Sequence, residues 1–116
     1  MVLGYYPIRA KGQISRLLCE YLHLDYVDRF FNPEEWNVFK ETEGKKWVLK
    51  DLPYLQDGDF VVTGPIGIAT YLVEKSGRMD LFGKNAEDQA EIDQIRMRCD
   101  LRTAMIGMTC VTRANC

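Results

Sequence analysis

The spacing of apolar residues changes several times along the chain, and the order of these changes predicts a mixed α/β domain. The apolar run at residues 2–6 is typical of a buried strand, which Pro7 ends. Helical spacing follows from Gly12, with one apolar face made by Ile14, Leu17, Leu18, Tyr21 and Leu22. Residues 26–31, rich in aromatic side chains, then predict a second strand.

A β-hairpin is predicted in the middle of the chain. Residues 34–50 carry little periodicity, which indicates a short helix followed by a loop. Asp57-Gly58 separates residues 53–56 from residues 60–63 and favours a tight turn, because glycine adopts positive φ without strain. The two flanking segments should therefore pair as antiparallel strands.

The hairpin leads into a predicted helix that Gly64-Pro65 begins and Ser76-Gly77 ends. The complete order is β-α-β, a loose connection, a β-hairpin and a helix. The first two strands should run parallel through a right-handed crossover, and the hairpin should lie on the other side of the first strand. The sequence therefore predicts an α/β, thioredoxin-like fold over residues 1–77.

A helical segment at residues 86–116 is predicted to follow a polar linker at residues 78–85. Its apolar residues form two stripes instead of one. The first stripe consists of Ile92, Ile95, Cys99 and Ile106. The second stripe consists of Met97, Leu101, Met105 and Met108. We expect the first stripe to pack on the thioredoxin-like domain. Because that domain offers only one surface, we expect the second stripe to contact another chain through residues 92–108, either a second copy in a homodimer or other protein subunits.

Composition narrows the functional classes. The 15 Lys and Arg residues stand against 17 Asp and Glu, a net charge of -2, so we expect no nucleic-acid partner. No apolar run has the length of a membrane span and no signal or transit peptide is visible, which predicts a cytoplasmic protein. We expect neither a metal site nor a disulfide framework from one histidine and four irregularly spaced cysteines: Cys19, Cys99, Cys110 and Cys116.

Short motifs distributed along the chain resemble the amino-terminal domain of mu-class glutathione transferases. The motifs are Leu3-Gly4-Tyr5-Tyr6 with Ile8-Arg9, Arg16-Leu17-Leu18 with Glu20-Tyr21, Leu52-Pro53-Tyr54-Leu55 with Asp57-Gly58, and Leu81-Phe82-Gly83. They cover nearly the whole chain in the family's order. The resemblance implies a thioredoxin-like domain followed by the first helix of an all-helical second domain, the rest of which we expect to be missing.

The resemblance implies that Tyr5 is a catalytic residue. In that family the glutathione sulfur reacts as a thiolate, and a tyrosine hydroxyl at the end of the first strand donates a hydrogen bond to it. Such a charge-assisted bond, worth roughly 1.5–3 kcal/mol, lowers the thiol pKa by about one to two units. Tyr6 stands where the mu class usually has tryptophan. Both tyrosines would also suit a strand that packs in the core.

Further glutathione contacts are implied for Leu52-Pro53, Trp36 and Lys40. The Leu52-Pro53 bond should be cis, with the Leu52 backbone pairing with the peptide backbone of glutathione. Trp36 and Lys40 have the spacing of the mu-class residues that hold the glycyl carboxylate, for which both supply donors. A plain turn proline and a packing tryptophan on a solvated helix are the alternatives. Glutathione is implied as co-substrate, with no other cofactor.

Three departures from the family's pattern argue against full activity. Gly64-Pro65 replaces a Gln-Ser pair that holds the γ-glutamyl carboxylate, which removes two or three donors worth roughly 1.5–3 kcal/mol each. Asp51 replaces an asparagine, and Glu34-Glu35 stand where an arginine often precedes the tryptophan. Two functions are therefore open: a transferase that conjugates glutathione to electrophiles, and a non-catalytic, transferase-derived structural or interaction subunit of a larger assembly.

Overall fold

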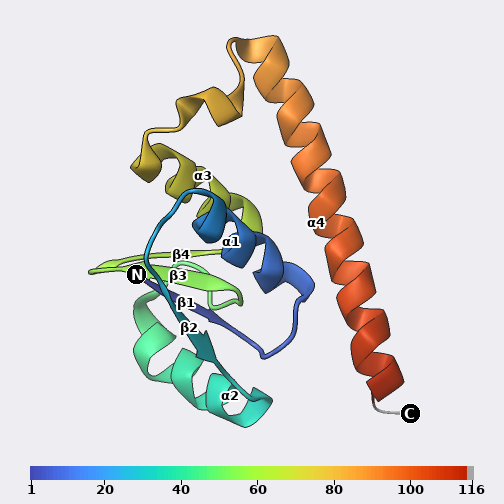
Figure 1. The fold of residues 1–116 in the computed structure, drawn as a ribbon. Helices are drawn as coiled ribbons and strands as arrows, with labels where there is room; N and C mark the ends of the chain where they lie inside the picture. Colours follow the sequence, from blue (N-terminus) through green and yellow to red (C-terminus); the bar gives the residue numbers. More distant parts are fainter. Residues whose placement is uncertain (115–116) are drawn as a thin grey trace.

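A four-stranded mixed sheet forms the centre of the molecule in the computed structural model, which describes the backbone of residues 1–114 and the side chains of residues 1–100 (Figure 1). Its strands are β1 (Val2–Tyr5), β2 (Val27–Phe30), β3 (Tyr54–Asp57) and β4 (Phe60–Thr63). Their order is β2-β1-β3-β4, with β1 parallel to β2 and antiparallel to β3. The predicted thioredoxin-like topology, with the first strand inside the sheet, is therefore confirmed.

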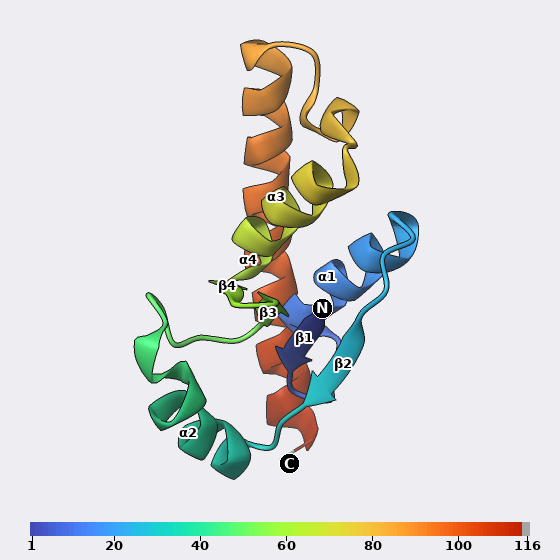
Figure 2. The same ribbon diagram turned by 90° about the vertical axis from the view of Figure 1, so that its left-hand side faces the viewer.

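Helices cover both faces of this sheet. They are α1 (Ala10–Tyr21), α2 (Pro33–Glu41), α3 (Pro65–Ser76) and α4 (Ala86–Ala114), with short 3-10 turns at Glu43–Lys46 and Met79–Phe82. α1 and α3 lie together on one face and α2 lies on the other (Figures 1 and 2). α4 contacts α1 and α3, and it therefore adds a further layer on their side of the sheet.

Local sequence explains where α2 and α3 begin and end. Asn32 caps α2, because its side-chain oxygen accepts the Glu35 N–H at 2.8 Å while the Glu35 carboxylate accepts the Asn32 N–H at 3.2 Å. α3 begins at Pro65, because proline lacks an N–H and the first residue of a helix has no partner within the helix for one. It stops before Gly77, which adopts φ +73°.

Two hydrophobic clusters fill the two faces of the sheet. The aromatic cluster lies under α2 and consists of Tyr5, Phe31, Trp36, Phe39, Leu52 and Tyr54. The aliphatic cluster lies under α1 and α3 and consists of Leu3, Cys19, Leu55, Ile68 and Leu72. In the aliphatic cluster, burial raises the pKa of the Cys19 thiol to about 11, so this cysteine is an inert core residue.

The face that α4 turns toward the domain differs from the predicted one. Ile95 is 60% exposed and Cys99 is also exposed, so these members of the first stripe do not pack on the domain. The residues on the inner face are half-buried instead: Ile92, Asp93, Arg96 and Asp100. Arg96 explains this orientation, because its guanidinium donates to Asp93 at 2.6 Å and to Thr70 of α3 at 3.2 Å.

The second apolar stripe of α4 is described only at its first member. Met97 is 51% exposed, as expected for a face that the domain does not cover. The remaining side chains of both stripes lie outside the described residues: Leu101, Met105, Ile106 and Met108. Within the described part of the chain, no helix is long and apolar enough to cross a membrane.

Candidate functional site

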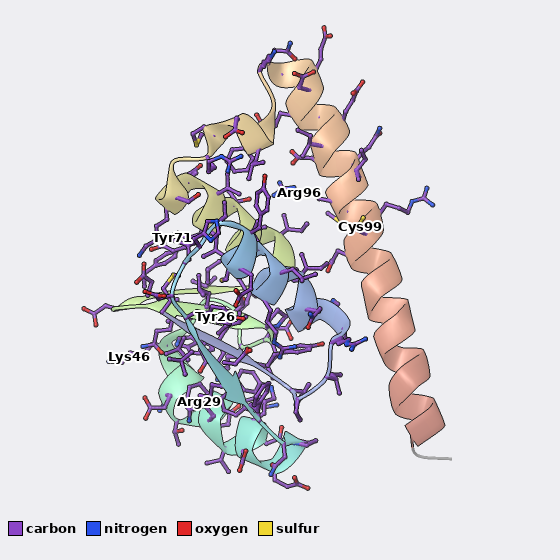
Figure 3. All side chains as sticks on the ribbon, in the orientation of Figure 1. Tyr26, Arg29, Lys46, Tyr71, Arg96 and Cys99 are labelled. Atoms are coloured by element: carbon purple, nitrogen blue, oxygen red, sulfur yellow. The ribbon has the colours of Figure 1, made fainter. Side chains whose placement is uncertain are left out.

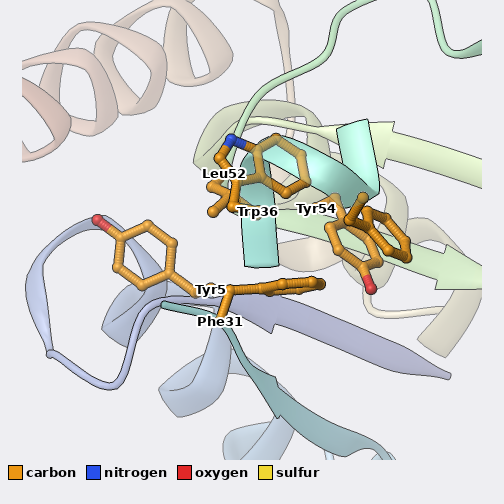
Figure 4. Close-up of a cluster of buried hydrophobic side chains, with 6 residues drawn as sticks. Tyr5, Phe31, Trp36, Leu52 and Tyr54 are labelled. Carbon is orange, nitrogen blue, oxygen red and sulfur yellow. The ribbon is translucent and has the colours of Figure 1, made fainter. Parts of the chain in front are cut away.

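The carboxyl end of β1 brings two tyrosines to the start of α1. Tyr5 is the last residue of β1, and its ring lies against Gly12 in the first turns of α1. A Cβ atom at position 12 would approach Cδ2 of Tyr5 to 2.5 Å, so only glycine leaves room for the ring. The Tyr5 hydroxyl points away from Trp36 and Tyr54, although the ring belongs to the aromatic cluster (Figure 4).

The surroundings of the Tyr5 hydroxyl keep it protonated. Burial raises the pKa of Tyr5 above its usual value of 10.0, and the negative charge of Asp51 adds to this effect. The backbone N–H of Lys11 and the positive charge of Arg16 oppose it without cancelling it. At neutral pH the Tyr5 side chain is therefore a neutral hydrogen-bond donor. Burial and Asp51 also raise the pKa of Tyr6.

Arg16 holds the connection between β1 and α1 in place. Its guanidinium donates to the backbone oxygens of Ile8 at 2.8 Å and Tyr6 at 3.3 Å, and it pairs with Asp28 of β2 at 3.0 Å. The same group lies 5.9 Å from the centroid of the Tyr5 ring. Arg16 thus positions the backbone that carries both tyrosines, a role that the sequence pattern did not indicate.

The segment before β3 adjoins the two tyrosines. The Leu52-Pro53 bond is cis, as predicted, and Leu52 is buried in the aromatic cluster with Tyr5. The Leu52 N–H donates to the side-chain oxygen of the neighbouring Asp51 at 2.8 Å. The backbone donor that was expected to face glutathione is therefore occupied by a carboxylate of the same chain.

Gly64 and Pro65 connect β4 to α3 beside this segment. The Gly64 N–H donates to the Pro53 oxygen at 2.9 Å, and Gly64 adopts φ +89°, a conformation that side-chain-bearing residues rarely take. Pro65 has no N–H to offer. The start of α3 therefore provides fewer donors for an anion than an ordinary helix start, in agreement with the departure noted in the sequence.

Trp36 and Lys40 lie on α2, and only Trp36 joins the aromatic cluster. Trp36 is 6% exposed, with its ring 5.6 Å from that of Phe31 and 6.0 Å from that of Phe39. This burial matches the alternative of a packing tryptophan. Lys40 lies one turn further along α2, half-buried, and makes no ion pair or side-chain hydrogen bond with another described residue.

The structure thus gathers most of the predicted site residues around the end of β1: Tyr5, Tyr6, Trp36, Asp51, Leu52, Pro53, Gly64 and Pro65. The Lys40 side chain makes no hydrogen bond or ion pair with any of these residues. No group of three metal-ligating side chains occurs within residues 1–100. The arrangement supplies one neutral hydroxyl donor beside a backbone segment and a nearby negative charge.

Sequence comparison finds similar proteins in several animals and in a slime mould. The chain is 32% identical over 94 residues to glutathione S-transferase P 1 of Xenopus laevis and 36% identical over 95 residues to a putative glutathione S-transferase alpha-2 of Dictyostelium discoideum. It is 31% identical over 94 residues to a class-mu 26 kDa glutathione S-transferase of Schistosoma mansoni. These matches cover 80–81% of this chain. No family model matches.

Solved structures agree with the sequence matches. A glutathione S-transferase from Ascaris lumbricoides superposes with a TM-score of 0.65 at 28% identity, over 81% of this chain and 42% of its own. A nematode-specific glutathione S-transferase from C. elegans superposes with a TM-score of 0.67 at 26% identity, over 82% of this chain and 44% of its own. The chain spans less than half the length of the curated relatives, 43–47% for those named above.

Proposed function

We propose that this chain, which carries a glutathione S-transferase-type amino-terminal domain, binds glutathione at the carboxyl end of β1 and activates its thiol for transfer to electrophiles. The observation that carries the proposal is the place of the Tyr5 hydroxyl. It stands at the end of β1, turned away from the core, with its ring packed beside Leu52. The relatives' names support the same ligand and reaction class.

The chemical role of Tyr5 follows from its protonation. Because its pKa lies above the usual value, the hydroxyl is an O–H donor at neutral pH and no base. Donation to the glutathione sulfur stabilises the thiolate, and the sulfur electron pair then forms a carbon–sulfur bond with an electrophilic carbon. The carbon in turn loses a leaving group with its electron pair, or passes the electrons of a conjugated double bond to the neighbouring atoms, which a proton from solvent neutralises. The thiol proton leaves to solvent. A bond worth roughly 1.5–3 kcal/mol shifts the thiol pKa down by about one to two units.

Binding of the remaining parts of glutathione is proposed for the neighbouring residues. Leu52 and Pro53 would face the peptide backbone of the ligand, with Tyr6 beside them, and Lys40 would lie at its glycyl end next to the buried Trp36. Asp51 weakens this site in two ways: it occupies the Leu52 N–H, and it places a negative charge beside an anionic ligand. With few donors at Gly64 and Pro65, we expect millimolar rather than micromolar affinity.

Assembly with a second chain is part of the proposal. Ile95 and Met97 leave an exposed apolar surface on α4, which suits contact with another copy or with another subunit. The non-catalytic alternative, an interaction subunit in a larger assembly, uses this same surface and needs no glutathione. Binding of glutathione therefore separates the two functions.

The test is a pH titration of bound glutathione, followed by thiolate absorbance in the ultraviolet, for the wild type and for Tyr5→Phe. Phenylalanine fills nearly the same space and lacks only the hydroxyl. We expect the pH for thiolate formation to rise by about one to two units in the variant, with affinity nearly unchanged. Tyr6→Phe is the matched control and should titrate as the wild type does. An identical profile for wild type and Tyr5→Phe would remove Tyr5 from the mechanism.

A further inference from the structure

β2 lies at an edge of the sheet, and its outer side is open in the part of the chain that the structure describes. Only β1 pairs with it, and Val27 and Phe30 are 63% and 54% exposed. The Val27 N–H donates to the Met1 oxygen at 2.9 Å and the Phe31 N–H to the Tyr5 oxygen at 3.0 Å. Backbone groups alternate along a strand, so those of Asp28 and Phe30 point to the open side.

Three cavities flank this open edge, and Phe30 lines all of them. One of about 750 Å³ lies on the α2 side, between β2 and residues such as Glu34 and Val38. A second of about 600 Å³ lies at the carboxyl end of β2, and a third of about 260 Å³ lies on the α1 side, next to Pro7 and Ile8. A strand placed beside β2 would thus find room for its side chains on both faces.

The two faces of the edge differ in charge. On the α2 side the cavity carries three exposed carboxylates: Glu34, Glu35 and Glu43. Among the described residues, the single cation that lines it is Arg29 of β2 (Figure 3). Its guanidinium lies 4.8 Å from the ring centroid of Phe31 and 4.6 Å from that of Phe39. The α2 face is therefore acidic overall.

The α1 face of the edge combines apolar side chains with a net positive charge. Pro7, Ile8 and Phe30 line its cavity together with three charged residues, of which Arg16 and Asp28 form an ion pair at 3.0 Å and Arg9 is exposed. Because Arg9 leaves this face with a net positive charge, apolar side chains of an occupant suit it better than cationic ones. The two faces together call for a strand with cationic side chains on one face and apolar side chains on the other.

We propose that the open edge of β2 binds an extended segment of a partner protein, which adds as a fifth strand with Lys or Arg toward α2 and apolar residues toward Phe30. Its backbone would bond to Asp28 and Phe30, its cations would meet the carboxylates of α2, and its apolar side chains would cover Phe30 and Ile8. This mode of recognition takes affinity from main-chain bonds and specificity from alternate side chains. The partner is thus a basic, amphipathic strand.

A second copy of this chain fits the edge poorly. In an antiparallel pair of two β2 strands, the open side allows three registers: Asp28 opposite Asp28, Asp28 opposite Phe30, and Phe30 opposite Phe30, the last of which overlaps the two strands at Phe30 alone. The first register sets Asp28 opposite Asp28, and the second sets Arg29 opposite Arg29. Like charges directly opposite destabilise a strand pair, and both copies also bring the same acidic face. A different, basic chain is favoured.

Fluorescence anisotropy with short synthetic peptides tests the proposal on the full chain. The probe alternates lysine and valine, a second peptide alternates glutamate and valine, and a third is the lysine peptide with N-methylated backbone amides. We expect the lysine peptide to bind at least about tenfold more tightly than either of the others, since one lacks the cations and the other lacks backbone donors. Equal binding of the lysine peptide and its N-methylated form would contradict strand addition.

Surface variants locate the binding site. Glu34→Gln with Glu43→Gln should weaken the lysine peptide by roughly three- to tenfold, because two exposed charges facing the ligand are removed. Glu87→Gln, an exposed change of the same kind on α4, should leave binding unchanged. These residues are exposed, so the fold is retained and circular dichroism verifies it. If the double variant binds as the wild type does, the peptide lies elsewhere and the proposal is wrong.

Discussion

The two faces of the sheet are packed in different ways, and the difference separates function from stability. The aliphatic cluster contains small, mutually packed side chains with no polar group directed at a ligand site. The aromatic cluster contains rings joined by close contacts, such as Phe31 and Phe39 with centroids 5.1 Å apart, and its member Tyr5 carries a hydroxyl at the site. Changes on the first face should therefore alter stability alone, whereas changes on the second should also alter the site.

The largest expected effect comes from the aliphatic cluster. Leu72 is fully buried, so Leu72→Ala leaves a cavity and should lower the free energy of unfolding by about 2–5 kcal/mol. Urea denaturation followed by circular dichroism measures this. At temperatures where the variant is folded, its tyrosine titration should match that of the wild type. A changed titration would show that the two faces are not separable.

A smaller loss of stability, with a change at the site, is expected where α1 meets the Tyr5 ring of the aromatic cluster. Gly12→Ala forces the Tyr5 ring to move, because the new methyl group would sit 2.5 Å from Cδ2, and this should cost about 1–3 kcal/mol. Gly67→Ala is the matched change on α3, where only a Val62 methyl at 3.0 Å must yield. Gly12→Ala should shift the pH at which Tyr5 titrates, whereas Gly67→Ala should not. Equal titration of Tyr5 in the two variants would contradict the difference between the two faces.

The pH dependence of stability offers a further test on the α3 side. Asp57 bonds to Lys75 and Tyr71, and these bonds hold the pKa of its carboxyl below the ordinary 3.8. Because the folded pKa is the lower one, the stabilisation is present at neutral pH and is lost as pH falls below about 4. Asp57→Asn should flatten this acid-side slope in unfolding experiments. An unchanged slope would exclude the ion pair as its source.

The smallest expected effect concerns ligand affinity alone. Asp51→Asn removes a negative charge near both tyrosines and keeps an oxygen that accepts the Leu52 N–H. We expect glutathione to bind roughly three- to tenfold more tightly by calorimetry, as a charge of the ligand's own sign is lost. Asp59→Asn, an exposed change in the hairpin turn, is the control. Weaker binding after Asp51→Asn would indicate that Asp51 contacts the ligand's amino group.

Local patterns predicted most of the fold. Proline and glycine marked the hairpin and the limits of α3, and the observed helix runs from Pro65 to Ser76 between Gly64 and Gly77. The parallel pairing of β1 and β2 followed from the length of the crossover between them. These features depend on neighbours in sequence or on general rules of chain connection, and for this reason one sequence was sufficient.

Features set by contacts between distant elements were missed. The inner face of α4 depends on Arg96 reaching Thr70, twenty-six positions earlier, and apolar spacing carries no sign of that bond. The sequence marks Arg16 only as part of the Arg16-Leu17-Leu18 motif, although its guanidinium holds the connection between β1 and α1 through bonds to Ile8 and Asp28. The Asp51 contact with Leu52 also required the folded backbone. Where one side chain has several possible partners, the sequence therefore does not determine which of them it contacts, and the structure is required.

Amide chemical shifts during a glutathione titration test the central claim most directly. Each backbone amide of a ¹⁵N-labelled chain gives a separate signal, so the binding site of the ligand is located without an activity assay. We predict that the amides of Tyr6, Lys11 and Leu52 shift with one common dissociation constant, while those of Leu72 and Glu87 stay in place. Shifts confined to residues away from the end of β1, or none at millimolar glutathione, would contradict the account.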